Sequence, residues 1–99
     1  MEIEEIKKEV ARIVREELKR DSIKHRAFFF GSRISGTASP RSDLDVGIEG
    51  KEALSSDIFR SIKTRCEALP TLYSIDIVDF ANIGDDFKKV ALRHTEEII

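Results

Sequence analysis

The chain has 99 residues and a formal net charge of −2, and 36% of its residues are charged. A chain of this length supports one modest hydrophobic core, so we expect a single domain over residues 1–99. The acidic balance gives no general attraction to nucleic acid, and no apolar run approaches the roughly 20 residues that span a bilayer. We therefore expect a cytoplasmic protein that has no membrane contact and does not bind nucleic acid directly.

The first part of the chain predicts a helix followed by a strand. Residues 2–20 carry apolar side chains at intervals of three and four between Lys, Arg and Glu, which indicates an amphipathic helix. Residues 27–30 (AFFF) then form an apolar run without alternation, which is typical of a strand covered on both faces. We expect this strand to lie centrally in a sheet.

The middle of the chain predicts a second strand and a second helix. Residues 43–48 alternate, so that one strand face belongs to the core while Asp43, Asp45 and Gly47 lie on the open face. Helical spacing returns over about residues 51–69, where Ser55 is one of three candidate caps. Cys66, the only cysteine, is expected to be a small core residue of this helix.

The remaining residues predict a third strand and a last helix. Residues 71–80 alternate with Ile75 and Ile77 toward the core and Asp76 on the open face. Residues 84–95 have helical spacing, and we expect Phe87 and Val90 to face inward, together with Ile83 and Ala91. Three or four strands backed by helices on one face make a two-layer α/β (α+β) domain.

Two features of this pattern suggest chemistry. Asp43 and Asp45 point the same way, about 7 Å apart along a strand, and hard carboxylate oxygens suit Mg²⁺, with room for two ions. Asp76 is the candidate third carboxylate, whereas Asp79 has the core-facing parity and is the weaker choice. Paired aspartates at a strand start are common on protein surfaces, so the pair alone is a weak signal.

The second feature is the small-residue loop between the first two strands. Gly31 permits close backbone approach, and Ser32 offers a hydroxyl at the start of a helical turn, which suits a phosphate. The lysine that a P-loop requires before Thr37 is missing, so the loop does not match the motif of a Walker ATPase. Arg33 and Arg41 are placed to reach phosphate oxygens, although a solvated arginine is the alternative for both.

Taken together, the motifs resemble a known family. Gly31-Ser32, ten residues, Asp43-Leu44-Asp45 and the later YSIDIVD strand of residues 73–79 are similar to the minimal nucleotidyltransferases of the DNA polymerase β superfamily. The resemblance covers nearly the whole chain and implies the nucleotidyltransferase fold, with a small mixed sheet. It also implies a Mg²⁺-dependent enzyme that transfers a nucleoside monophosphate, usually AMP from ATP, to an acceptor hydroxyl.

The resemblance also implies roles and a partner. Gly31, Ser32 and Arg33 would hold the triphosphate, Asp43 and Asp45 would bind metal, and Asp76 would be the third carboxylate at the attacking hydroxyl. Minimal members often form a complex with a small helical HEPN protein, in which they serve as the antitoxin by adenylylating the toxin. The alternative is a binding module that masks a partner protein, with or without bound nucleotide, and performs no chemistry.

Overall fold

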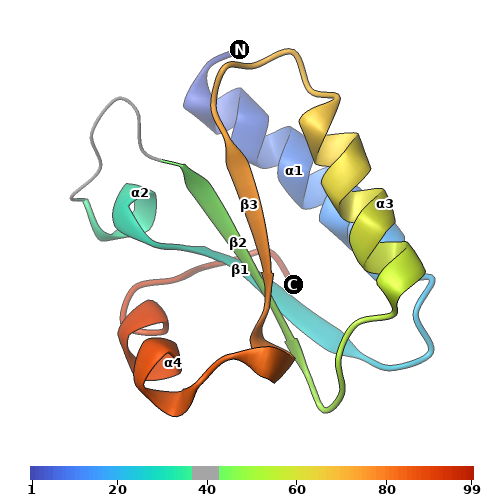
Figure 1. The fold of residues 1–99 in the computed structure, drawn as a ribbon. Coiled ribbons are helices and arrows are strands. Elements are labelled where there is room, and N and C mark those ends of the chain that lie inside the picture. The colour runs from blue at the N-terminus through green and yellow to red at the C-terminus, as the bar shows by residue number, and fades with distance from the viewer. Residues whose placement is uncertain (37–42) are drawn as a thin grey trace.

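The computed structural model describes residues 1–36 and 43–99, which form one four-stranded sheet and its helices (Figure 1). The strand order is β3-β2-β1-β4, with β1 antiparallel to β2 and β4, and β2 parallel to β3. This confirms the predicted fold, including the central position of β1. The elements are α1 (Ile3–Leu18), β1 (His25–Phe30), α2 (Ser32–Ser35), β2 (Leu44–Gly50), α3 (Ser56–Glu67), β3 (Ile75–Asp79), the 3₁₀ helix η1 (Phe80–Asn82), α4 (Asp85–Ala91) and β4 (Glu96–Glu97).

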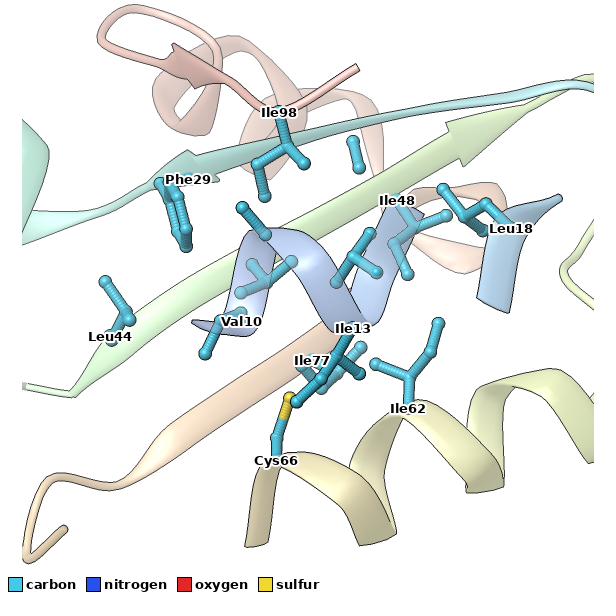
Figure 2. Packing of buried hydrophobic residues seen from close by; sticks show 14 of the residues in the cluster. Val10, Ile13, Leu18, Phe29, Leu44, Ile48, Ile62, Cys66, Ile77 and Ile98 are labelled. Carbon is cyan, nitrogen blue, oxygen red and sulfur yellow. The ribbon is translucent and has the colours of Figure 1, made fainter. Parts of the chain in front are cut away.

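The main core lies between the sheet and the two long helices, α1 and α3, which cover the same face of the sheet (Figure 1). Figure 2 shows α1 lying against the sheet, with the sulfur of Cys66 turned from α3 toward Ile13 and Ile77. Cys66 is 2% exposed, which confirms it as a core residue. Ser55 caps α3 by accepting a hydrogen bond from the amide of Ile58 at 3.4 Å.

The opposite face of the sheet carries a second, aromatic cluster. Phe28, Phe30 and Phe80 are almost fully buried there, with Ala91 of α4 packed against them. Because successive residues of β1 point to opposite faces, Ala27 and Phe29 belong to the main core and Phe28 and Phe30 to this cluster. The strand is therefore covered on both faces, as predicted. Helix α4 lies on the face away from α1 and α3 (Figure 1), so the expectation that the helices pack on one face of the sheet was wrong for α4.

Two predicted core residues of α4 are in fact exposed. Phe87 is 50% exposed and Val90 is 62% exposed, whereas Ala91 is buried and Ile83 packs partly against the aromatic cluster. A helix of only seven residues, resting on a small patch of aromatic rings, buries a narrow stripe and leaves the next positions open. The expectation that Phe87 and Val90 are core residues was therefore wrong, although one side of the Phe87 ring contacts the aromatic cluster.

The N- and C-terminal parts of the chain meet at the sheet edge. The short strand β4 pairs with β1, with Glu97 opposite Phe28, and no sequence pattern identified it.

His25, at the start of β1, is only 6% exposed, and its ring nitrogens lie 2.9 Å and 3.0 Å from the carbonyl oxygens of Ile23 and Glu52. No helix in residues 1–36 and 43–99 is long and apolar enough to cross a membrane.

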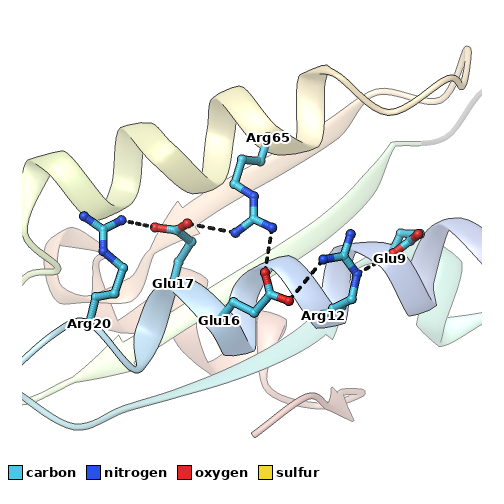
Figure 3. Close-up of polar contacts among 6 residues, drawn as sticks. All are labelled: Glu9, Arg12, Glu16, Glu17, Arg20 and Arg65. Atoms are coloured by element: carbon cyan, nitrogen blue, oxygen red, sulfur yellow. Dashed lines mark hydrogen bonds and ion pairs between the residues drawn. The ribbon is translucent and has the colours of Figure 1, made fainter.

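A polar network links the two long helices at the surface (Figure 3). Arg65 of α3 donates to Glu17 at 2.8 Å and to Glu16 at 2.7 Å, and Glu17 also accepts from Arg20. Burial by itself would raise the pKa of Glu17, but the hydrogen bonds from Arg65, Ser61 and Arg20 outweigh it and lower this pKa. The carboxylate of Glu17, in a residue only 6% exposed, is thus stabilised in its charged form.

Candidate active site

The chain leaves β1 through a glycine that no other residue replaces easily. Gly31 has φ +83° and ψ −166°, a backbone conformation that side chains disfavour, and α2 begins at the next residue. A Cβ atom at Gly31 would overlap the carboxylate of Asp45 and lie 3.2 Å from its Cγ atom. The missing side chain therefore lets the loop backbone pass directly against Asp45.

The register of the sheet brings the predicted carboxylates to one corner. Asp45 of β2 is paired with Asp76 of the parallel strand β3, and neighbouring strands lie about 4.8 Å apart. The amide of Leu44 donates to the carbonyl of Ser74 at 2.9 Å, which fixes this alignment at the start of both strands. Asp43 precedes Asp45 by two residues, and the charges of Asp43 and Asp76 both act on the carboxylate of Asp45.

The electrostatics of this corner centre on Asp45. Asp43 and Asp76 are exposed, while Asp45 is partly buried. Burial, and then the negative charges of Asp76 and Asp43, raise the pKa of Asp45 to about 6. Within residues 1–36 and 43–99, no three His, Cys, Asp or Glu side chains are gathered closely enough to hold a metal ion as they stand.

Asp79 serves a structural purpose at the other end of β3. Its Oδ1 atom accepts a hydrogen bond from the amide of Ala81 at 2.9 Å, which caps η1. Its Oδ2 atom accepts from the amide of Leu54 at 2.8 Å and thereby holds the segment before α3. Of the two candidates for a third carboxylate, Asp76 is therefore the one that lies beside Asp45.

The arginine that follows Ser32 rests on an aromatic ring. The guanidinium carbon of Arg33 lies 4.6 Å from the ring centroid of Tyr73, which immediately precedes the Ser74–Asp76 segment. Stacking of this kind restricts a long, flexible side chain. Arg33 is thus held at the edge of the sheet where Asp43 and Asp76 lie, while Arg41 lies outside the described residues.

Sequence reasoning missed two neighbours of the carboxylates. Tyr73 is the first residue of the YSIDIVD motif, but the motif gave it no role, and only the contact with Arg33 reveals its position. Phe30 is the partner of Asp45 on β1, so the row across the sheet reads Phe30, Asp45, Asp76. A buried aromatic ring on one side of Asp45 and a carboxylate on the other explain why its charge is disfavoured.

Comparison with known proteins identifies the family to which the chain belongs. Residues 13–99 match the family model described as polymerase beta, nucleotidyltransferase. The chain is 29% identical over 86 residues to the probable protein adenylyltransferase MntA of Haemophilus influenzae, covering 87% of this chain and 75% of that protein.

Solved structures share the fold at low sequence identity. A toxin–antitoxin crystal structure with AMP-PNP matches with a TM-score of 0.65 and 18% identity over 90% of this chain and 72% of that one. A tri-AMPylated Shewanella oneidensis HEPN toxin in complex with MNT antitoxin matches with a TM-score of 0.66 and 12% identity, covering 97% of this chain and 71% of the other. With the family match over most of its length, the chain belongs to the polymerase β nucleotidyltransferase family.

Proposed function

We propose that this chain transfers AMP from ATP to a hydroxyl group of a protein, with Asp43, Asp45 and Asp76 as its catalytic carboxylates. The observation that carries the proposal is the meeting of Gly31, Asp45 and Asp76 at one corner of the sheet. A site that moves a nucleotide needs a backbone that approaches phosphate closely and carboxylates that can manage the charge of the reacting groups.

Each residue of this corner would have a separate role in the reaction. Gly31 and Ser32 would hold the triphosphate, and Arg33, steadied by Tyr73, would contact a phosphate oxygen. The acceptor oxygen would form a bond to the α-phosphorus as the bond from that phosphorus to pyrophosphate breaks. Asp76, which is exposed, would orient the acceptor hydroxyl and take its proton.

The donor set of this corner suits Mg²⁺. Oxygen ligands from aspartate are those that Mg²⁺ prefers, and a cation would relieve the repulsion that raises the pKa of Asp45. Asp43 and Asp76 have exposed side chains, so small rotations would direct their oxygens toward an ion beside Asp45. Bound Mg²⁺, as one ion or two, would neutralise charge on the α-phosphate and on the leaving pyrophosphate.

The relatives support AMP as the group and a protein as the acceptor. The Haemophilus influenzae relative is described as a probable protein adenylyltransferase, one structural neighbour was crystallised with AMP-PNP, and another is bound to an AMPylated HEPN toxin. We propose that this chain likewise acts as the antitoxin, or the catalytic subunit, of a pair with a small helical HEPN-type partner.

Label transfer from ATP to the partner tests the proposal. Purified protein with Mg²⁺, ATP labelled at the α-phosphate and the product of the adjacent gene should label that product, and Asp45→Asn should abolish labelling. Thermal unfolding of Asp45→Asn provides the control, because removing a repelled charge should leave the fold intact or more stable. Labelling that persists in this variant would exclude the proposed site.

The same variants separate catalysis from simple masking of a partner. A binding module would neutralise the partner equally well as wild type, Asp43→Asn or Asp45→Asn. We expect both variants to lose neutralisation while still binding the partner in a pull-down. Neutralisation that survives both substitutions would show that chemistry is not needed.

A further inference from the structure

A cavity of about 290 Å³ lies next to the carboxylate corner, between the end of β1 and α4. Its lining is largely apolar, with a basic residue and a histidine from the turn after α4. The residues around it are Gly31, Phe87, Val90, Ala91, Arg93 and His94.

Phe87 is held in position although it is half exposed. Its ring centroid lies 6.4 Å from that of Phe30 at an interplanar angle of 86°, and 6.3 Å from that of Phe80 at 56°. Both partners are buried, so one side of Phe87 is anchored in the aromatic cluster while the rest of the ring stays accessible. Val90, one helical turn later, adds a second exposed apolar side chain to the same cavity.

Gly31 connects the cavity with the carboxylates. Gly31 lines the cavity and also contacts the carboxylate of Asp45. A molecule bound at Gly31 can therefore reach both the cavity and this carboxylate. Phe30 provides a second link, since it is opposite Asp45 in the sheet and its ring contacts Phe87. An apolar hollow is thus continuous with the place where the phosphates of a nucleotide would lie.

We infer that this cavity receives the heteroaromatic base of the nucleotide, with the ring of Phe87 as its stacking surface. The inference rests on the proposed function, because it takes the triphosphate to lie at Gly31 and Ser32. A cavity of about 150 Å³ accommodates a benzene ring, so 290 Å³ is sufficient for a purine. Arg93 and His94 provide polar groups that can face the nitrogen atoms at the edge of the adenine base.

Titration calorimetry with two probes, ATP and inorganic triphosphate, tests this assignment by measuring the affinity of the protein for each. ATP contains the base and the phosphates, whereas inorganic triphosphate contains only the phosphates. Phe87→Ala should weaken ATP binding by roughly tenfold, the usual effect of removing an aromatic surface from a stacked base, and leave triphosphate binding unchanged. Phe87→Tyr keeps the ring and should bind ATP as wild type does.

Leu72→Ala is the matched control, because Leu72 is a fully exposed apolar residue that does not line the cavity. It should change the affinity for neither probe. Equal ATP affinity in Phe87→Ala and wild type would overturn the inference, as would an equal loss for both probes. If Phe87→Ala binds ATP as wild type does and still labels the partner from ATP, the proposed function stands and the base site is wrong. If wild type binds neither ATP nor triphosphate, both the proposed function and the base site are wrong.

Discussion

The backbone of Gly31 and the side chain of Asp45 occupy adjoining space, so that any side chain at position 31 would collide with the carboxylate. This contact joins the loop that would hold phosphate to strand β2, which contains Asp45 and is directly preceded by Asp43. The register between Asp45 and Asp76 adds the third from a different part of the chain. The candidate site is therefore built on the backbone of the sheet.

Gly31→Ala should impair transfer severely. The φ angle of +83° costs roughly 1 kcal/mol or more for a residue with a side chain, and the added methyl group would displace Asp45. A displacement of about 1 Å in a catalytic group can lower a rate about 100-fold, and we expect a loss of that order in label transfer.

Gly84→Ala is the control for that substitution. Gly84 has φ −67°, and a Cβ atom there would meet nothing within 4 Å. We expect transfer close to that of wild type and unfolding changed by less than about 1 kcal/mol. If Gly31→Ala transferred label as well as Gly84→Ala, the contact with Asp45 would have no catalytic importance.

Asp76 and Asp79 should respond to substitution in opposite ways. Asp76→Asn should abolish label transfer without destabilising the protein, since it removes one of the charges that repel Asp45. Asp79→Ala should lower the free energy of unfolding by about 2 kcal/mol, because the amides of Leu54 and Ala81 lose their acceptor. Denaturant unfolding and label transfer on both variants check this, and the reverse pattern would make Asp79 the third carboxylate.

Much of this arrangement was predictable because it depends on short-range patterns. The alternation in β2 and β3 identified the faces of Asp45 and Asp76, and the loop motif identified Gly31. The sequence predicted that Asp45 and Asp76 lie on the same face of the sheet, but not that they are paired directly. That register depends on contacts such as the hydrogen bond between Leu44 and Ser74.

Other features depend on tertiary packing that the local sequence does not encode. The exposure of Phe87 follows from where a short helix rests on the aromatic cluster, and β4 consists of only two residues. The burial of His25 depends on a carbonyl from Glu52, 27 residues away. The stacking of Arg33 on Tyr73 likewise joins segments whose proximity only the folded sheet creates.

Tyr73 should affect ATP use through Arg33. Tyr73→Ala removes the ring on which the guanidinium rests, and we expect the KM for ATP to rise about two- to fivefold, in line with an exposed cation–π contact. Tyr73→Phe retains the ring and should behave as wild type. Steady-state transfer at varied ATP checks the pair, and an unchanged KM in Tyr73→Ala would mean that Arg33 does not need this support.

Acid should weaken the link between α1 and α3. Hydrogen bonds lower the pKa of Glu17 in the folded protein below its usual value of 4.5, so the stabilisation is present above that pH and is lost as the pH falls through the lowered pKa. Glu17→Gln should unfold more easily than wild type by about 1 to 2 kcal/mol at pH 7.

The same comparison in acid completes the test. At pH 3 or below, the difference between Glu17→Gln and wild type should shrink, because the wild-type carboxylate is itself becoming protonated. Denaturant unfolding at the two pH values measures the change. A difference that stays constant would mean that the charge of Glu17 contributes nothing to its bonds with Arg65.

The position of the label on ATP tests the central claim most directly. Parallel reactions with the proposed HEPN-type partner, Mg²⁺ and ATP labelled at either the α- or the γ-phosphate distinguish transfer of a nucleotide from transfer of a phosphoryl group. The α-label should appear on the partner and the γ-label in released pyrophosphate. The Asp45→Asn variant should neither label the partner nor release pyrophosphate. Transfer of the γ-label to the partner, or no transfer of either label by wild type, would contradict the account.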